Sequence, residues 1–255
     1  MIQTHLENRI GYIILNRPEK CNALNDEMAA AFHKALNDFK DNTDCKIVII
    51  KAVGEAFCAG ADLDYLKKLQ AYTYEQNLQD STNLMQMFSA LLHFPKITIA
   101  QVQGAALAGG CGLASLADFC FATPDSKFGY TEVKIGFIPA IVSVFLSKKI
   151  GGNAAKKLLL TGQIINSQEA MNLGLITQVA ANETIENEVN NFANQLAQSI
   201  SAESISLTKQ LLTQMEGKSL SEQLTLAAEA NAKVRGTEDC IKGISSFLNK
   251  EKLNW

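Results

Sequence analysis

Short β-branched runs alternate with amphipathic helical patterns over the first half of the chain, and this alternation constrains the fold more than any other feature. The runs are Ile10–Leu15, Ile47–Val53 and Ile97–Val102. The second run is typical of a strand that is buried on both faces of a sheet. Because alternating strands and helices pack as layers in an α/β fold, we predict a core of repeated βα units.

Capping residues place the first helices. Asn25 precedes two acidic residues and an apolar stripe, which predicts an N-cap followed by a helix with one buried face. Thr73 and Gln76 form a capping box for a helix that runs to about Leu92. Further along we predict a small-residue helix over Ala106–Ala117 and a short strand over Phe119–Ala122.

After Pro139 the chain contains no proline, and helical patterns dominate. Ser219 with Glu222 is another capping box, and Thr237 begins a last predicted helix. We therefore predict a core over residues 1–195 and an all-helical region over residues 196–255. Helices this short bury little surface alone, so we expect them to pack on the core or on a neighbouring subunit.

Composition narrows the class of protein. Hydrophobic residues make up 47% and charged residues 19% of the chain, which suits a packed core. The formal net charge of −3 leaves no basic face for nucleic acid. We expect no membrane span, signal peptide or transit peptide. The six cysteines lack a CxxC pair and are interpreted as reduced thiols, which predicts a cytoplasmic protein.

Two glycine-bearing segments follow strand-like runs. They are Phe57–Leu63, with the sequence FCAGADL, and Gly104–Leu113, with the sequence GAALAGGCGL. Backbone N–H groups at a tight turn or a helix N-terminus form a fixed positive pole. Such groups stabilise the charge that develops on a carbonyl oxygen during a reaction. Together the segments predict a pair of N–H donors that bind one oxygen.

Each segment also has a purely structural interpretation. The glycines of the second segment could serve only to let a helix pack closely on a sheet. In the first segment, Asp62 could be an ordinary helix cap. A phosphate-binding function is not supported, because GxxxxGK[ST] is absent and Ser115 stands where the dinucleotide fingerprint needs a glycine or alanine.

Glu132 is the only acidic residue between Asp125 and Glu169, and apolar residues flank it. It could be a first-turn helix acid or the ion-pair partner of Lys134. It could also be a general acid and base whose pKa is raised by burial beside the oxyanion site. Taken alone, Glu132 fits the structural interpretation better.

Other chemistry receives less support. Cys111, at a predicted helix N-terminus, could be a thiolate nucleophile, but no histidine motif accompanies it. His5, His33 and His93 lack the spacing of metal ligands, so we predict no metal site.

Several motifs together resemble the enoyl-CoA hydratase/isomerase (crotonase) superfamily over the whole chain. They are Asn16–Leu24, Phe57–Leu63, Ala108–Leu113, Phe128–Pro139, Leu160–Gly162 and Thr237–Phe247. The resemblance implies a spiral core of ββα repeats, a C-terminal helical trimerisation region, and a homotrimer or dimer of trimers. It also implies an acyl-CoA thioester substrate with no separate cofactor, since CoA is part of the substrate.

Site residues carry over by motif. The resemblance assigns the two oxyanion donors to the N–H groups of Ala61 and Gly109 and the acid and base to Glu132. It further implies a group of substrate-binding residues, the last two of which reach a CoA from the tail, commonly that of a neighbouring subunit. These residues are Lys20, Ala23, Ala59, Gly60, Asp62, Leu63, Gly110, Pro139, Phe247 and Lys250.

The sequence departs from the two-carboxylate hydratases at Gly112, where those enzymes carry a second glutamate. Residues Ala140–Val142 also replace a glycine-rich run that shapes the acyl pocket. The resemblance then implies hydration or dehydration of a 2-enoyl-CoA, and the branch similar to methylglutaconyl-CoA hydratase suggests a branched, carboxylated substrate from leucine degradation. A Δ3,Δ2-enoyl-CoA isomerase with a single glutamate and a non-catalytic CoA-binding homologue remain open.

Overall fold

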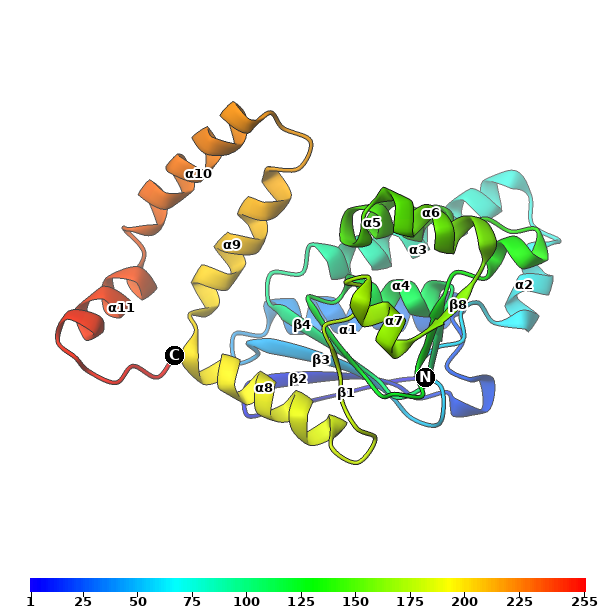
Figure 1. Cartoon of the computed structure of the whole chain (residues 1–255), viewed down its shortest axis with the longest axis horizontal. Helices are drawn as coiled ribbons and strands as arrows, with labels where there is room; N and C mark the ends of the chain where they lie inside the picture. The colour runs from blue at the N-terminus through cyan, green and yellow to red at the C-terminus, as the bar shows by residue number, and fades with distance from the viewer.

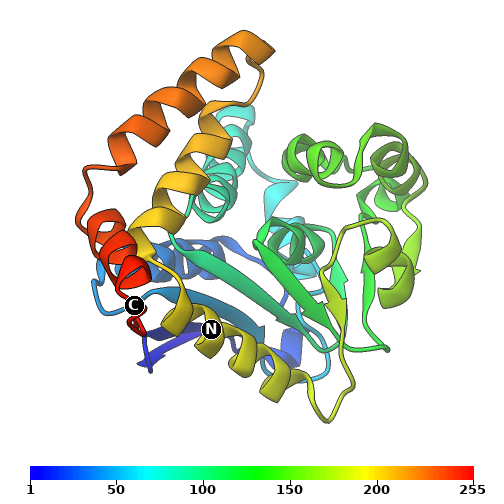
Figure 2. The ribbon, with the colours of Figure 1, turned by 60° about the vertical axis from the view of Figure 1, so that its left-hand side comes forward.

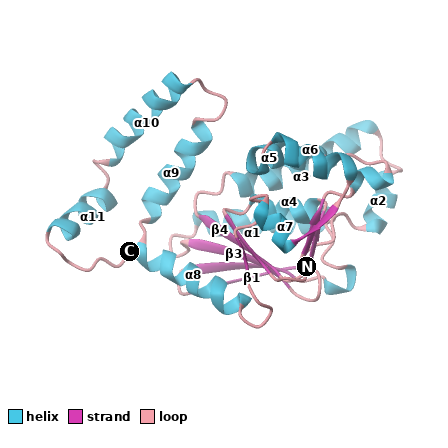
Figure 3. Cartoon of the chain, viewed as in Figure 1, coloured by secondary structure: helices cyan, strands magenta, loops and turns pink.

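The computed structural model describes all 255 residues and contains two β-sheets. The larger sheet has the order β1-β2-β3-β4-β6-β9, drawn in magenta in Figure 3, and every pair after β1–β2 is parallel. Its strands are Ile2–Glu7, Ile10–Leu15, Ile47–Ala52, Ile97–Val102, Phe119–Ala122 and Gln178–Val179. The smaller sheet, β5-β7-β8, consists of Ala105–Leu107, Lys127–Gly129 and Ile164–Asn166. This α/β architecture agrees with the predicted fold class.

The predicted strands are confirmed as β2, β3, β4 and β6 to within a residue. Strand β1 was not predicted. It lies at the edge of the sheet, pairs only with β2 and is mostly exposed, so its sequence lacks the apolar run of a buried strand.

The predicted caps are confirmed. Asn25 accepts a hydrogen bond from the N–H of Met28 at the start of α1 (Asp26–Asp41). The Thr73–Gln76 capping box begins α3 (Tyr74–Leu92). In Figure 1 α1 lies beside the larger sheet, and its buried face is the predicted stripe, whereas α3 packs on α1 and α4.

The helix predicted over Ala106–Ala117 begins later than expected. Residues Ala105–Leu107 form β5 instead, which pairs with β7, and α4 spans Gly109–Leu116. The N–H of Cys58 donates to the Ala105 carbonyl at 3.0 Å, and the N–H of Leu107 donates to the Cys58 carbonyl at 2.9 Å. These long-range bonds override a local pattern of helix-forming alanines.

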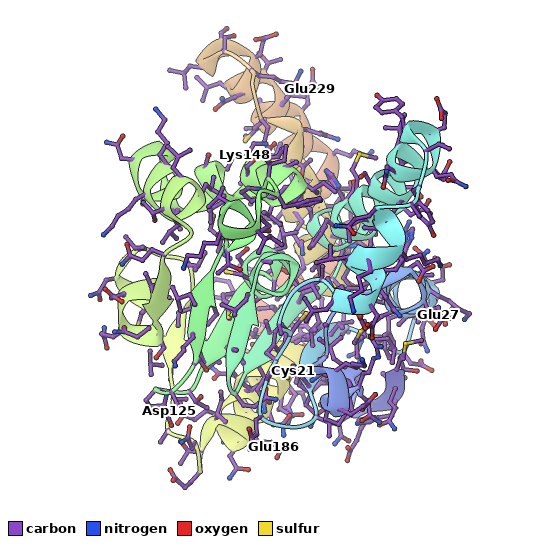
Figure 4. The ribbon with its side chains drawn as sticks, turned by 90° about the vertical axis from the view of Figure 1, so that its right-hand side faces the viewer. Cys21, Glu27, Asp125, Lys148, Glu186 and Glu229 are labelled. Carbon is purple, nitrogen blue, oxygen red and sulfur yellow. The ribbon has the colours of Figure 1, made fainter.

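Shorter elements complete the core. The 3₁₀ helices are η1 (Pro18–Lys20) and η2 (Glu132–Ile135). The other α-helices before the C-terminal region are α2 (Leu63–Leu69), α5 (Ala140–Ile150), α6 (Gly152–Thr161) and α7 (Ser167–Asn172). Figure 4 views the molecule from the side where these helices lie, with Glu27 of α1 and Lys148 of α5 far apart on this face.

Four helices end the chain: α8 (Ile185–Ser199), α9 (Ala202–Gln214), α10 (Leu220–Val234) and α11 (Glu238–Leu248). Helix α8 packs on the larger sheet, whereas α9–α11 extend away from the core and bury no residue (Figures 1 and 2). The boundary that we placed at residue 195 falls inside α8. The division into two domains stays a prediction. No helix is both long and apolar enough to cross a membrane.

Candidate active site

A cavity of about 1000 Å³ opens between the two glycine-bearing segments, α1–α3 and the start of α5. Its walls are largely apolar. The predicted site residues among its lining are Ala59, Ala61, Leu63, Gly109, Glu132 and Pro139. Residues from three separate parts of the sequence therefore face one space.

Two isolated bridges hold the first glycine segment, one to the second glycine segment and one to Leu24. Cys58 pairs in parallel with Ala106, and Leu24 pairs in parallel with Ala61. The N–H of Leu24 donates to the Gly60 carbonyl at 2.6 Å, and the N–H of Asp62 donates to the Leu24 carbonyl at 2.8 Å. These two bonds hold residues 60–62 against Leu24, so the N–H of Ala61 is fixed in place before any reaction begins.

Two of the glycines are required by close contact. A Cβ atom on Gly110 would lie 2.2 Å from the carbonyl oxygen of Cys58, so no side chain fits there. Gly60 has φ +98°, a conformation that favours glycine, and a Cβ atom on it would lie 2.8 Å from the Cβ of Ala108. This close packing is the structural role that we considered for the glycines, and it also brings the segments together.

The N–H groups of Ala61 and Gly109 donate to no acceptor in the chain. Gly109 is the first residue of α4, where orphan N–H groups are expected. Ala108 before it has the strained angles φ 48° and ψ −122°, and its own N–H donates to the Gly129 carbonyl at 2.8 Å. Strained backbone of this kind, held by the surrounding structure, is common at functional sites.

Glu132 lines the cavity at the start of η2. Its Oε2 is buried and has no hydrogen-bond partner, and no cation lies within ion-pair distance of its carboxylate. The ion pair with Lys134 that we considered is therefore not present. Burial raises the pKa of the Glu132 carboxyl, only partly opposed by a hydrogen bond from its own backbone N–H. A carboxyl with a raised pKa can both accept and return a proton near neutral pH.

Asp62 is the helix cap that we considered. Its carboxylate accepts from the N–H groups of Asp64 and Tyr65 at the start of α2, and it forms an ion pair with Arg17 at 2.6 Å. Burial acts to raise its pKa, but Arg17 and the two N–H groups outweigh burial and lower it. Asp62 thus fixes the orientation of the chain beside Ala61.

The other predicted binding residues lie outside the cavity lining. Lys20 pairs with Asp64 at 2.9 Å, and Ala23 is buried next to Leu24. Phe247 and Lys250 lie at the end of α11, and the side chain of Phe247 is 83% exposed. A single chain does not bring these two tail residues to the cavity.

Cys111 does not have the environment of a nucleophile. It is fully buried, and burial raises the pKa of its thiol to about 12. A thiolate at this position is therefore strongly disfavoured near neutral pH.

Some cavity residues were missed by sequence reasoning. On α1 most of them repeat with helical spacing opposite the buried stripe, a pattern that is visible in the sequence. These are Asp26, Ala30, His33 and Asn37, and the buried Ala29 also lines the cavity. Tyr65 of α2 donates from its hydroxyl to the carboxylate of Asp80 on α3, and both line the cavity. Nothing in the sequence joins these two residues.

The position of the missing second carboxylate is filled by apolar atoms. A Cβ atom on Gly112 would lie 2.7 Å from Val142 Cγ1 and 3.1 Å from Phe88 Cε1. Phe88 and Val142 also line the cavity. The wall beside Gly112 is consequently hydrophobic.

Comparisons with known proteins agree with this fold and site. The family model "Enoyl-CoA hydratase/isomerase" matches residues 5–255, and the chain belongs to this family of enzymes. It is 39% identical to a Thermus thermophilus protein grouped with the enoyl-CoA hydratases, over 98% of both chains. It is 30% identical to the crotonyl-CoA hydratase of Syntrophomonas wolfei, over 98% of this chain and 95% of that protein. The crystal structure of an enoyl-CoA hydratase from Shewanella pealeana superposes with a TM-score of 0.95 at 32% identity, covering 100% of this chain and 95% of that one.

Proposed function

We propose that the protein adds water reversibly to a 2-enoyl-CoA. The N–H groups of Ala61 and Gly109 bind the thioester oxygen and stabilise the enolate that forms when water adds at Cβ. Glu132 takes a proton from that water and helps to deliver a proton to Cα. The CoA moiety belongs to the substrate, and no other cofactor is needed.

The single observation that carries this proposal is the shared cavity. It contains two residues whose N–H groups lack an acceptor in the chain, and it contains the Glu132 carboxyl, whose buried Oε2 has no hydrogen-bond partner. Unpaired buried polar groups are rare in folded proteins because each one costs free energy. A thioester oxygen and a water molecule would satisfy both kinds of group.

The isomerase alternative is favoured by one observation, the hydrophobic wall at Gly112. A Δ3,Δ2-isomerase needs only one base, which carries a proton between Cα and Cγ. A hydratase with Glu132 alone must position the water with a single carboxylate. The relatives named for hydration favour the hydratase.

The finer substrate assignment rests on the resemblance and on the altered cavity wall. Val142, which replaces a small residue of the family pattern, narrows the space beside Gly112. A branched acyl group such as methylglutaconyl is our first candidate, and leucine degradation is the corresponding pathway. A CoA-binding homologue without activity is disfavoured because Glu132 is retained.

The remaining assignments are also proposals. Exposed apolar residues on the tail helices, including Leu220, Leu224, Ile241 and Ile244, support a homotrimer or a dimer of trimers. Phe247 and Lys250 would then reach a neighbour's site. We propose a cytoplasmic location on the basis of the thiol pattern.

A product assay tests the proposal. The protein is incubated with linear, branched and carboxylated 2-enoyl- and 3-enoyl-CoAs in water labelled with heavy oxygen, and the products are analysed by mass spectrometry. Incorporation of one labelled oxygen identifies a hydratase. Migration of the double bond without incorporation identifies an isomerase, and the absence of both, with no exchange of the Cα proton, would show a binding protein.

A further inference from the structure

A buried polar cluster lies behind the cavity, outside its lining. It consists of Tyr130, Ser115 and Cys111, whose exposed fractions are 0%, 6% and 0%. The proposed reaction uses none of these side chains. Buried polar groups generally persist where their hydrogen bonds fix a unique arrangement.

The hydrogen bonds of this cluster cross between two elements. The hydroxyls of Tyr130 and Ser115 lie 3.3 Å apart, and the Ser115 hydroxyl also lies 3.2 Å from the Gly112 carbonyl. The Cys111 thiol contacts the same Tyr130 hydroxyl. Ser115 and Cys111 belong to α4, whereas Tyr130 follows β7.

The two connected elements carry the two halves of the proposed site. Helix α4 begins at Gly109, and Tyr130 stands two residues before Glu132. The bond from the Ala108 N–H to the Gly129 carbonyl ties the N-terminal end of α4 to β7. The Tyr130–Ser115 contact is a second attachment near the other end of α4. Lys149 also donates to the Ser115 and Ala117 carbonyls at that end, but it comes from α5, so the Tyr130–Ser115 contact is the one that ties this end of α4 to the segment that carries Glu132.

We propose that Tyr130 is a positioning residue, which through Ser115 holds Glu132 and the Gly109 N–H in a fixed mutual orientation. The inference rests on the proposed function, because it concerns the geometry of that reaction. Tyr130 touches neither the substrate nor the reacting atoms in this role.

The cluster stays uncharged while the site works. Burial raises the pKa of the Cys111 thiol to about 12 and that of the Tyr130 hydroxyl well above its ordinary value. The charge of nearby Glu132 raises both further. The Tyr130–Ser115 hydrogen bond therefore does not titrate near neutral pH.

The test is the variant Tyr130→Phe, which removes one oxygen atom and keeps the ring. Ser115 can still donate to the Gly112 carbonyl, so no hydroxyl is left unpaired and the protein is expected to fold. We expect kcat for enoyl-CoA hydration to fall on the order of tenfold, because small misplacements of reacting groups are costly. KM is expected to change by less than about twofold, since the binding surface is intact.

Ser115→Ala removes the other partner of the Tyr130–Ser115 hydrogen bond. It tests the positioning role if Tyr130→Phe proves unstable. The double variant is expected to be about as slow as either single variant, since both lose one shared interaction. A dienoyl-CoA bound to each protein gives a second readout. The red shift of its carbonyl stretch, which reports hydrogen bonding to the thioester oxygen, should be smaller in both variants.

Tyr12→Phe is the matched control. The buried Tyr12 donates to Asn190 at 3.0 Å on the opposite side of the sheet from α4, and its loss should leave kcat and the carbonyl stretch unchanged. Wild-type kcat and carbonyl stretch in Tyr130→Phe and Ser115→Ala would overturn the positioning role alone. A wild-type protein that adds no water to any enoyl-CoA would instead overturn the proposed function, and the two failures are thereby distinguished.

Discussion

A Cβ atom on Gly60 would lie 2.8 Å from the Cβ of Ala108, so the two glycine-bearing segments touch where each supplies a free N–H group. Gly60 precedes Ala61 and Ala108 precedes Gly109. The contact therefore sets the spacing of the two proposed oxyanion donors. Because the two segments approach this closely, both positions carry a small residue, glycine at 60 and alanine at 108.

We expect Gly60→Ala to impair both folding and catalysis. The new methyl group would crowd Ala108 and the Leu107 carbonyl, and it would stand on a residue with φ +98°, which disfavours any side chain. Overpacking of this kind costs about 1–3 kcal/mol of stability. A displaced Ala61 N–H should lower kcat by on the order of 10²-fold. Chemical denaturation and steady-state kinetics measure the two effects.

Gly174→Ala is the matched control, since Gly174 has φ +74° but no atom within 4 Å of the added Cβ. It should share the backbone strain and keep full activity. Equal loss of kcat in both variants would mean that the Gly60–Ala108 contact does not set the site.

Replacement of Glu132 by glutamine should abolish most turnover. Removal of a general acid and base costs about 10²–10⁴-fold in rate. The variant should retain its affinity for a saturated acyl-CoA, measured by calorimetry, because the oxyanion donors remain. Glu27→Gln changes an exposed acid on the outer side of α1 (Figure 4) and should be fully active. Normal hydration by Glu132→Gln would remove this residue from the mechanism.

The same variant should be more stable than the wild type near neutral pH. The folded-state pKa of Glu132 is raised above its ordinary value of 4.5, so the folded protein disfavours the ionised form. The protonated Glu132 carboxyl is favoured in the folded protein. Its contribution to stability is therefore fully present below the pKa of the unfolded state and is lost as the pH rises through the pKa of the folded state. Glutamine carries no charge and removes this loss.

Thermal unfolding at several pH values measures the difference between the two proteins. The advantage of Glu132→Gln should be present near neutral pH and vanish below a pH of about 4. A stability advantage that is constant over this pH range would show that burial does not raise the pKa of Glu132 in the folded protein. The activity of the wild type should decline toward acid pH as the Glu132 carboxylate is protonated.

Local patterns in the sequence predicted the parts of the fold that local chemistry determines. The Asn25 cap and the Thr73–Gln76 capping box were placed correctly because side chain and backbone bond within one turn. Strand β3 was recognised because it is buried on both faces. These signals need no knowledge of distant residues.

Long-range contacts account for what local patterns could not provide. Residues Ala105–Leu107 form a strand only because Cys58 and β7 lie beside them. The Tyr65–Asp80 hydrogen bond joins two helices. The roles proposed for Ala61, Gly109 and Glu132 came from several motifs considered together, and the structure adds that these residues line one cavity. The tail residues Phe247 and Lys250 lie away from the cavity of their own chain, so their role in binding stays a prediction.

The last prediction concerns a second carboxylate at position 112. A second carboxylate at this position would help to hold the attacking water, so Gly112→Glu would increase hydration of a linear enoyl-CoA if the pocket had room. The structure shows that Val142 Cγ1 and Phe88 occupy that space, at 2.7 Å and 3.1 Å from the added Cβ. The single variant should therefore lose about 1–3 kcal/mol of stability through overpacking and gain no activity.

Truncation of Val142 should make room for the new side chain. In the double variant Gly112→Glu with Val142→Ala, the two carboxylates could hold water together, and hydration of a linear substrate should rise above that of Val142→Ala alone. Val142→Ala is the necessary control, since a wider cavity by itself can admit other acyl groups. Denaturation curves and kcat/KM for crotonyl-CoA measure both properties. The double variant could fold as well as Val142→Ala and yet hydrate no faster. A carboxylate at position 112 would then not reach the reacting carbon even when space is available. Crowding by Val142 would in that case not be the reason why a second carboxylate gives no gain.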